Sequence, residues 1–577
     1  MIAAATSVAA IVTVLLTPAA AALARRSGTV AKPRADRWHT SPTPMLGGIA
    51  LATGVIVPLV AFIDRSIAIV LLAAFASTLL GLTDDVRHIS PSSKLVGQVL
   101  IATGLYLGGV NVEVIPVAPV AFLLTVLWVV GIMNAINLLD NMDGLAAGIS
   151  LTAASVLLID TAARNPDAAV IAGVTAGAAA GFLIHNFPPA RVFMGDAGSQ
   201  LLGVLLASTA LLQTIGAASS LSLVIVAPIF VLALPIFDVA FVTMTRRLRG
   251  SPISRGGRDH TSHRLTALGI SERATVLGLY GVAAFLGVLG IVGQTLSPLV
   301  LPLLVLSVVG LALFGVFLWQ ADSMTTQAAT TPASRMSRTL STYARFGFEI
   351  GLDVLLLTTA YFTAFAMRFE GVPFSFWSQP FGLTLPIVVA AQLAVLVLLG
   401  VYRTLWRHIA LEDTVLILRA ITLGSAVAAL AVFMVLEVPG VSRAAILIDW
   451  VLATGFVIGA RMFLVWLRRW FARRPRAGDR RVLIIGASDH GELALRLLSR
   501  SPQGGFRMIG FLDDDPGKRY RRLAGIPVLG TTSELAAVVR ERSIDTVIVA
   551  TEGGDGAARV REVCQELGLD CREFVFQ

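Results

Sequence analysis

Long apolar segments separated by short polar ones fill the first 470 residues of the chain. Runs close to the ~20 residues that span a bilayer lie at about 2–24, 45–63, 66–83, 95–110, 117–138, 144–163, 168–185, 199–216, 220–244, 274–295 and 298–320. Four more lie at about 346–367, 382–401, 413–437 and 442–467. This pattern predicts a polytopic α-helical membrane protein with about 11 + 4 transmembrane helices.

The pattern changes after the basic segment RRWFARRPRAGDRR. RVLIIGASDHGELALRLLSR reads as a strand, a glycine turn and a helix, and RMIGFLDDDP as a second strand that ends in acids. Asp513 follows Gly491 by about 20 residues, as in dinucleotide-binding βαβ units. Ser488 occupies the second glycine position of G-x-G-x-x-G after Gly486. We expect a C-terminal cytoplasmic Rossmann-like α/β domain, which either binds a nucleotide or is a ligand-free docking module.

Four parts follow from these patterns. Residues 1–320 form a first membrane domain, 321–342 a polar cytoplasmic linker, 343–470 a four-helix transmembrane module and 478–577 the α/β domain.

Composition supports a membrane protein, since 14% of residues are charged and the mean hydropathy is +0.80, against roughly 25% charge in soluble domains. The net charge is +9, but the arginines are spread over the loops rather than gathered in one patch. They therefore suggest cytoplasmic loops, and no nucleic acid is expected as a partner. Cys564 and Cys571 fit no common zinc spacing and suggest a reducing compartment.

The charges also predict an orientation. No basic residue precedes the first apolar run, and Arg25 and Arg26 follow it. This order favours an uncleaved first span whose N-terminus lies outside. Alternation then places residues 25–37, 84–94, 137–143, 186–196 and 246–264 on the cytoplasmic side, together with the linker, the turn at 403–407 and the C-terminal domain.

Four of these loops carry unusual polar groups: GLTDDVRHISPSSKLVGQ, NAINLLDNMDGLAAG, NFPPARVFMGDAGSQLLG and RGSPISRGGRDHTSHRL. They contain Asp84, Asp85, Asp140, Asp143 and Asp196. Any one of them could simply be a solvated helix end. Four on one side favour a shared site, because Mg²⁺ binds one or two carboxylates plus substrate phosphates, and phosphoryl transfer depends on positioning and cationic groups.

Smaller patterns add detail to this site. Asn134, Asn137 and Asn141 recur at the spacing of one helical face. Asp143 suits the N-terminus of the following span, and the glycines that flank Asp196 let the backbone approach a ligand. His260 and His263, together with Arg255, Arg258 and Arg264, suggest a phosphate-rich substrate.

Together these motifs resemble the polyprenyl-phosphate N-acetylhexosamine-1-phosphate transferases over roughly residues 1–320. RDHTSHRL is closer to the branch that uses UDP-GlcNAc-type sugars than to the muramoyl-pentapeptide branch, which has consecutive histidines. The resemblance implies transfer of a sugar 1-phosphate from a UDP-sugar to undecaprenyl phosphate, with release of UMP. It places the reaction on the cytoplasmic face of the bacterial plasma membrane, at the start of cell-envelope polysaccharide synthesis. It also implies Mg²⁺, for which Mn²⁺ can substitute.

The resemblance assigns roles to individual residues. Asp84 would activate the lipid phosphate with support from Asp85, and Asp196 would bind the metal, with Asp85 as a second ligand. Asn141 departs from the glycine that the family usually has there, and asparagine tolerates the left-handed region. Substrate-binding roles fall on Lys94, Asn137, Asp140, Asp143, Asn186, Phe193, His260, His263 and Arg264; Asn186 would lie near the diphosphate, and Phe193 and Asp143 near the uracil.

Residues of about 340–550 resemble the N-terminal part of membrane-bound nucleotide-sugar dehydratases of the capsule and flagellin-glycan type. The resemblance makes Gly486, Gly491 and Asp513 candidate nucleotide-binding residues. It suggests that this part of the chain regulates the transferase or recruits a nucleotide-sugar-modifying enzyme. Membrane lipid is expected as a further partner, and the chain is expected to form a homo-oligomer. No Tyr-x-x-x-Lys dehydrogenase motif follows, so no dehydratase activity is expected.

Two rival functions predict different patterns. A transporter would place carboxylates near the bilayer midplane, within an internal repeat, whereas these acids lie at predicted helix ends and no repeat is apparent. A non-catalytic scaffold would not need the complete set of acids.

Overall fold

The computed structural model describes residues 1–31, 42–112, 117–214, 221–248, 250, 257, 259–295, 300–325, 335–403, 411–435, 440–472, 480–500, 506–550 and 555–574. Arg255 and Arg258, both predicted near the phosphates, lie outside these residues. The chain forms two compact units, and the second consists mainly of Trp470–Gln577.

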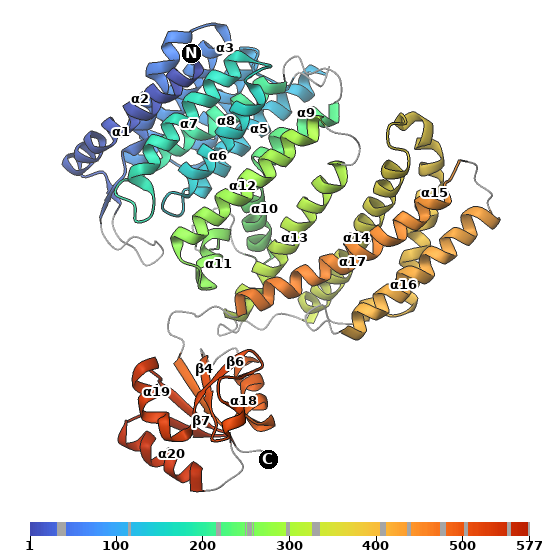
Figure 1. Cartoon of the computed structure of the whole chain (residues 1–577). Helices are drawn as coiled ribbons and strands as arrows, with labels where there is room; N and C mark the ends of the chain where they lie inside the picture. Colours follow the sequence, from blue (N-terminus) through green and yellow to red (C-terminus); the bar gives the residue numbers. More distant parts are fainter. Residues whose placement is uncertain are drawn as a thin grey trace. The chain divides into compact units, whose positions relative to one another are not determined.

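The first part of the chain is a bundle of helices (Figure 1). Its helices are α1 (Ile2–Ser27), α2 (Gly47–Leu59), α3 (Arg65–Arg87), α4 (Pro91–Leu107), α5 (Ala118–Leu139), α6 (Leu145–Thr161), α7 (Pro166–Asn186), α8 (Gly195–Thr214), α9 (Leu221–Val231), α10 (Ala233–Leu248), α11 (Thr261–Ala267), α12 (Glu272–Thr295) and α13 (Val300–Thr325). Two short strands, β1 (Val30–Ala31) and β2 (Thr43–Pro44), pair antiparallel.

Eleven helices in the described part of the chain are long and apolar enough to cross a membrane, and Gly47–Phe62 and Leu145–Thr161 are shorter apolar helices. The predicted polytopic α-helical fold is therefore confirmed. The run predicted at 220–244 is broken between α9 and α10 at Leu232. Pro235 has no N–H to bond Val231, and its ring crowds the carbonyl of that residue, so one continuous helix is disfavoured there.

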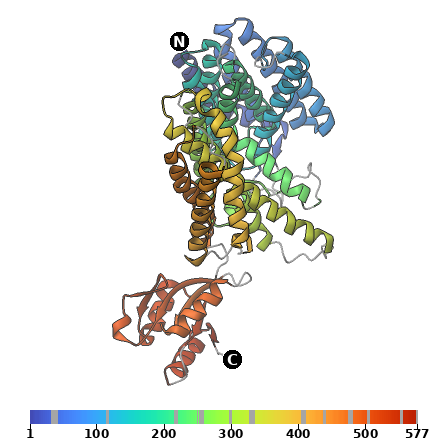
Figure 2. The same ribbon diagram turned by 90° about the vertical axis from the view of Figure 1, so that its right-hand side faces the viewer.

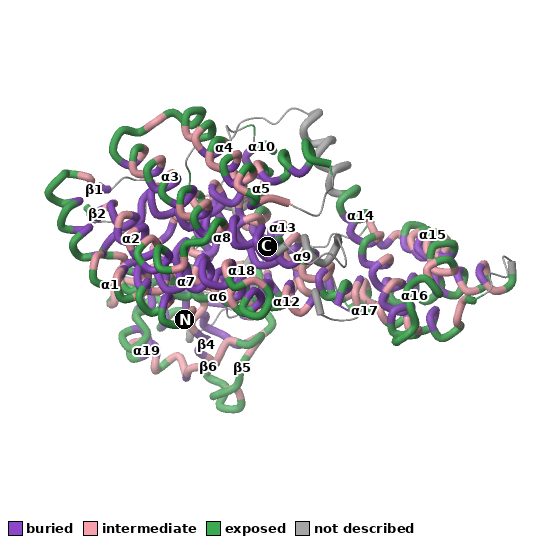
Figure 3. Tube along the Cα trace, turned by 90° about the horizontal axis from the view of Figure 1, so that it is seen from above, coloured by how far each residue is buried: buried purple, intermediate pink, exposed green. Residues whose placement is uncertain are grey.

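Close helix packing in the bundle depends on small residues. Gly173, Gly177 and Gly181 form one stripe on α7, and a side chain added at Gly177 would meet the carbonyl oxygen of Thr6 in α1. Glycine stripes of this kind let membrane helices approach closely. Most of α7 and α8 is buried (Figure 3), so α8 carries its N-terminus, with Asp196, on a rigid central element.

Residues 335–472 form four long helices: α14 (Arg335–Arg368), α15 (Phe374–Leu398), α16 (Leu411–Leu430) and α17 (Arg443–Ala472). Aromatic rings cluster between them, with Trp377, Tyr361 and Phe365 almost fully buried. A buried ion pair joins Asp353 of α14 to Arg461 of α17.

The C-terminal unit is the predicted α/β domain (Figure 2). Its strands are β3 (Arg480–Ile485), β4 (Phe506–Leu512), β5 (Arg522–Leu523), β6 (Ile526–Gly530), β7 (Thr546–Val549) and β8 (Asp570–Glu573), in the order β5-β6-β4-β3-β7-β8. All neighbours pair parallel except β5 and β6. Alternate residues of β3 pack against α18 (Asp489–Arg500) on one face, and against α19 (Leu535–Arg542) and α20 (Asp555–Glu566) on the other.

Candidate active site

Asp85 caps the N-terminus of α8. Its carboxylate oxygens accept the backbone N–H groups of Asp196 at 2.8 Å and of Ala197 at 3.1 Å. A carboxylate here satisfies two donors that have no partner within the helix and lies at the positive end of the helix dipole. Gly81, one turn earlier in α3, allows the two backbones to approach, because an added side chain would meet the backbone of Asp196. Asp85 therefore fixes α3 against α8.

Asp84 points to a different set of partners. Its Oδ2 lies 3.1 Å from Nζ of Lys94, and its Oδ1 accepts the N–H of Ile89 at 3.0 Å. The second bond closes the turn between α3 and α4, where His88 is in the left-handed region with φ +52°. Ser90 caps α4 with a bond from the N–H of Ser93, which sets Lys94 in the first turn of that helix.

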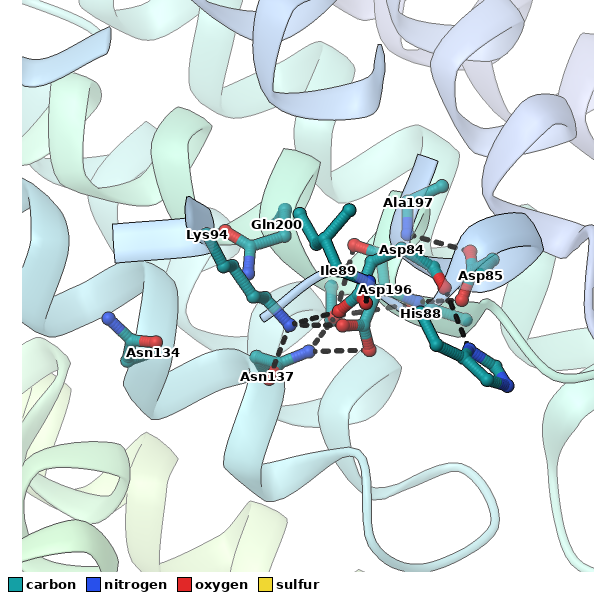
Figure 4. A network of polar contacts seen from close by, with 12 residues as sticks. Asp84, Asp85, His88, Ile89, Lys94, Asn134, Asn137, Asp196, Ala197 and Gln200 are labelled. Atoms are coloured by element: carbon teal, nitrogen blue, oxygen red, sulfur yellow. Dashed lines mark hydrogen bonds and ion pairs between the residues drawn. The ribbon is translucent and has the colours of Figure 1, made fainter. Parts of the chain in front are cut away.

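Lys94 joins two carboxylates that come from the first and third of the four polar loops (Figure 4). Its ammonium group bonds Asp196 as well as Asp84. Asn137 of α5 donates to Oδ1 of Asp196 and to Oγ of Ser199, at 2.9 Å in each case. The ends of α3, α4, α5 and α8 thus converge on one partly buried polar cluster.

A second layer of amides lies beside this cluster, and two of its members, Gln98 and Gln200, were not predicted as part of the site. Gln98 donates to Gln200 at 3.0 Å and accepts from Asn134 at 2.8 Å. A signal was present in the sequence: Gln98 follows Lys94 by four residues and Gln200 follows Asp196 by four, so each lies on the same helix face as its charged neighbour. These amides orient the helices that carry the charged groups.

The turn between α5 and α6 is held by the loop between α7 and α8. Oδ2 of Asp143 accepts the N–H of Ala190 at 2.8 Å, and the N–H of Gly144 donates to Asn186 at 3.1 Å. Asp143 directly precedes Gly144, which is the N-cap of α6, so this acid lies at the N-terminus of that helix as predicted. Gly144, with φ +73°, takes the left-handed position that was considered for Asn141.

Asn186 and Phe193 bracket this α7–α8 loop. The amide of Asn186 also donates to the carbonyl of Val192 at 2.9 Å, so its buried side chain links the α7–α8 loop to the α5–α6 turn. The N–H of Phe193 donates to the carbonyl of Pro44 at 2.8 Å. The loop that leads to Asp196 is therefore held by hydrogen bonds to Asn186 and to Pro44.

The predicted histidines lie on the short helix α11 or directly before it. His260 and His263 are buried, and their rings lie edge to face 6.2 Å apart. Oγ of Ser262 donates to Oδ1 of Asn141 at 2.7 Å, which ties α11 to the α5–α6 turn.

The structure brings Asp84, Asp85, Lys94, Asn137 and Asp196 together in one cluster. Asp140 and Asp143 lie in the adjoining turn, which is hydrogen-bonded to the loop of Asn186 and to α11 with its histidines. The three asparagines do not share one role, because Asn134 bonds Gln98, Asn137 bonds Asp196, and Asn141 follows the end of α5.

The charged groups fit a magnesium–diphosphate. Among the residues that the structure describes, no group of three or more His, Cys, Asp or Glu side chains is arranged to hold a metal ion alone. Mg²⁺ needs only one or two carboxylates when phosphates and water supply the other ligands. Asp84 and Asp196 lie close enough together to bond the same ammonium group, that of Lys94. Asp85 was predicted as a metal ligand together with Asp196. In the structure both of its carboxylate oxygens accept N–H groups at the N-terminus of α8 instead.

At the glycine turn of the α/β domain, the side chain of Asp513 bonds other residues of the same domain. Asp513 accepts the N–H of Ala487 at 2.7 Å and pairs with Lys518 at 3.0 Å. Gly486 has φ +98°, and Gly491 packs on its carbonyl. The first turn of α18 contains Asp489 and Glu492, whose charges oppose a phosphate at that helix end. A nucleotide bound at this turn would have to replace the bonds that Asp513 makes with Ala487 and Lys518.

Comparison with known proteins adds two family matches. A model described as glycosyl transferase family 4 matches residues 67–214, which contain the whole carboxylate and lysine cluster. A model described as a CoA-binding domain matches residues 397–568. The internal bonds of Asp513 and the acids of α18 disfavour a CoA pyrophosphate at the glycine turn as well.

Individual relatives match the first part of the chain. The "Probable undecaprenyl-phosphate N-acetylglucosaminyl 1-phosphate transferase" of Bacillus subtilis is 33% identical over 273 residues, 45% of this chain and 75% of that protein. The decaprenyl-phosphate N-acetylglucosaminephosphotransferase of Mycobacterium leprae is 34% identical over 308 residues, 46% of this chain and 77% of that protein. A phospho-N-acetylmuramoyl-pentapeptide-transferase of Moorella thermoacetica is 30% identical over 232 residues, 35% of this chain and 73% of that protein.

Proposed function

We propose a specific reaction for this chain, which belongs to the polyprenyl-phosphate N-acetylglucosamine-1-phosphate transferases of glycosyl transferase family 4. In this reaction an N-acetylhexosamine 1-phosphate passes from a UDP-sugar, with UDP-GlcNAc or a derivative as donor, to undecaprenyl phosphate. The products are a polyprenyl-diphosphate sugar and UMP. The reaction starts the synthesis of a cell-envelope polysaccharide.

One observation supports this proposal above the others. Asp84 and Asp196 meet at the ammonium of Lys94, although they come from helices more than 100 residues apart in the chain. Two carboxylates and a lysine at helix ends are the groups that a metal-bound diphosphate and an anionic acceptor require.

The transfer itself needs no covalent enzyme intermediate. An oxygen of the lipid phosphate attacks the β-phosphorus of the UDP-sugar and forms a new P–O bond. The bond from that phosphorus to the bridging oxygen breaks, and UMP leaves with the electron pair. Asp84 orients the attacking phosphate and accepts its proton, while Lys94 offsets the phosphate charge and Asn137 holds Asp196 in place.

Mg²⁺ held by Asp196 would neutralise the charge on the diphosphate. Asp85 acts one step away, by keeping the N-terminus of α8 in register with α3. The α7–α8 loop with Phe193, and α11 with its histidines, would bind the nucleotide and sugar ends of the donor.

The location of the acids also supports an enzyme over a transporter. Asp84 lies in the last turn of α3, and Lys94 and Asp196 lie in the first turns of α4 and α8. A multi-pass membrane protein with its acids at helix ends offers them to water-soluble donors. We place this end on the cytoplasmic side of the bacterial plasma membrane, with the N-terminus outside.

For the C-terminal third we propose a supporting role. The α/β domain is fused to the transferase, and its glycine turn is internally bonded. Recruitment of a nucleotide-sugar-modifying enzyme, or regulation within a homo-oligomer, fits this arrangement better than nucleotide chemistry.

Release of UMP tests the reaction. The purified full chain is incubated with undecaprenyl phosphate, Mg²⁺ and, in turn, UDP-GlcNAc, UDP-GalNAc and UDP-glucose. We expect UMP only with the N-acetylated donors, and at least about a 100-fold loss for Asp196→Asn. Asp167→Asn is the matched control, because it removes the same charge at the end of α7 away from Asn186.

Two results would refute the assignment. One is no UMP from any donor by folded wild-type protein, and the other is full activity of Asp196→Asn. A phosphorylated Asp84 trapped during turnover would replace direct attack by a two-step route.

A further inference from the structure

Asp238 is a buried carboxylate to which the transfer mechanism above gives no role. It lies in α10, and only 1% of the residue is exposed. Its Oδ2 lies 2.7 Å from Nδ1 of His260, and its Oδ1 accepts the N–H of Thr261 at 2.8 Å. Both oxygens are therefore directed at the residues that begin α11.

This pairing decides which nitrogen of His260 is available to a substrate. An ionised carboxylate only accepts hydrogen bonds, so the hydrogen between the two groups belongs to Nδ1. A partner at one ring nitrogen sets the tautomer and the orientation of the ring. Nε2 is then the nitrogen that His260 offers to a ligand.

The rest of the same α10 face also holds this segment. Phe241 and Arg246 follow Asp238 by three and eight residues, and these spacings place all three on one side of the helix. Arg246 forms two hydrogen bonds of 2.7 Å with Asp259, and the guanidinium of Arg264 lies 4.8 Å from the ring centre of Phe241. Residues 259–264 are thus bound at three points along α10.

Burial makes a purely structural role for Asp238 expensive. Removing a carboxylate from water costs several kcal/mol unless its partners compensate, and an apolar residue could pack α10 against α11 without that cost. Asp238 has one histidine and one backbone N–H as the compensating partners. The histidine is the partner that can act on a substrate.

From this geometry we propose that Asp238 is a positioning residue for the transferase reaction, acting through His260. Asp238 accepts the hydrogen bond from Nδ1–H and offsets the positive charge of the imidazolium form of His260, in which Nε2–H donates to a phosphate oxygen of the UDP-sugar. The proposal rests on the proposed function and adds to it a residue that binds no substrate itself.

A double-mutant cycle on the purified full chain tests it. We expect Asp238→Asn to lower kcat for UMP release by about 10- to 100-fold, the usual cost of losing a partner that orients a functional histidine, with a smaller change in KM. We expect His260→Ala to lower kcat at least as much. In the double variant kcat should match that of His260→Ala within about twofold, because Asp238 has no effect without its histidine.

Two controls separate positioning from general damage. Asp160→Asn alters another buried carboxylate of the same bundle, one that pairs with Arg164 and Gln213, and should leave kcat near the wild-type value. Thermal unfolding of every variant checks the fold. If Asp238→Asn does not fold, Asp238→Glu keeps the charge but displaces the ring, and the same cycle applies.

The outcomes are distinct. Wild-type kcat in Asp238→Asn overturns the inference, and so does an equal fall in kcat with and without His260. Absence of UMP release by the wild-type chain would instead refute the proposed function.

Discussion

Asp84 and Asp85 show how adjacent residues of one type acquire different functions. Successive residues on a helix point about 100° apart, so one carboxylate faces Lys94 and the other faces the N-terminus of α8. The pair is evident in the sequence, but the division of labour depends on which helix packs on each side. Asp85 holds α3 against α8, whereas Asp84 faces the cluster around Lys94.

This division predicts opposite responses to the same substitution. In Asp85→Asn the amide nitrogen would face a backbone N–H of α8 and the helix would lose its compensating charge. We expect a stability loss of about 1–2 kcal/mol, seen as a lower Tm. In Asp84→Asn we expect a fall in UMP release of about 100-fold with little change in Tm. The contrary pattern, an active but unstable Asp84→Asn, would reverse the two roles.

At the scale of elements, two of the buried acids in the four helices α14–α17, Asp353 and Asp449, have different surroundings. Asp353 makes two hydrogen bonds with Arg461, at 2.7 and 3.0 Å, and accepts from Tyr402. Oδ2 of Asp449 accepts a hydrogen bond from the side-chain amide of Gln392 at 2.7 Å. Oδ1 of Asp449 and the side-chain oxygen Oε1 of Gln392 have no hydrogen-bond partner in the described structure. One acid is paired with a cation and the other with an amide.

We therefore expect the two acids to differ in their tolerance of asparagine. Asp353→Asn removes the charge that makes two hydrogen bonds with the buried Arg461 and should cost about 3–5 kcal/mol. Asp449→Asn keeps the hydrogen bond from Gln392 and supplies an N–H donor for Oε1 of Gln392. The free energy of unfolding should therefore stay within about 0.5 kcal/mol of the wild-type value or rise. Thermal unfolding of the full chain measures both.

A double variant provides the check on this prediction. Asp353→Leu with Arg461→Met removes both charges, and replacing a buried pair by apolar residues is often neutral. It should recover at least half of the Tm lost in Asp353→Asn. No recovery would mean that the charge left on Arg461 is not the cause.

At the scale of the whole molecule, the site residues and the α/β domain belong to separate units. Both cysteines of the chain lie in the α/β unit, and Cys564 is fully buried. Burial, reinforced by the neighbouring Cys571, raises the pKa of the Cys564 thiol to about 12. Reaction of Cys564 with a thiol reagent therefore reports opening of this unit alone.

Asp513 gives that opening a pH dependence. Burial raises the pKa of Asp513, but the N–H groups of Asp515 and Ala487 and the ammonium of Lys518 outweigh it, so the pKa lies below its usual value. A lowered acid pKa stabilises the fold above the ordinary value of about 3.9, and the contribution is lost as the pH falls through the folded-state value.

The test uses Cys571→Ser, which leaves Cys564 to react with dithiodipyridine, a reagent active at acid pH. At pH 7 we expect Asp513→Asn to speed the reaction about 10-fold, while UMP release stays at the level of its parent. Below about pH 4 the difference should shrink. A nucleotide that protects Cys564 in wild type but not in Asp513→Asn would instead favour the nucleotide-binding interpretation.

The sequence alone was sufficient for the features that depend on local patterns. Apolar runs predict the membrane helices because a bilayer demands about 20 apolar residues in a row. Strand, glycine turn and helix signals predicted the α/β domain near Gly486, and its strands appear where expected. The cluster of acids in separate loops was equally evident, since unpaired charge beside apolar runs needs a reason.

The tertiary structure decided which of those groups meet. That Asp85 caps α8, that Lys94 joins Asp84 to Asp196, and that Asp238 pairs with His260 all depend on contacts between helices distant in the chain. Hydropathy is a property of each residue and its neighbours along the chain. A hydrogen bond also requires two atoms to lie about 3 Å apart, and only the packed bundle determines that distance.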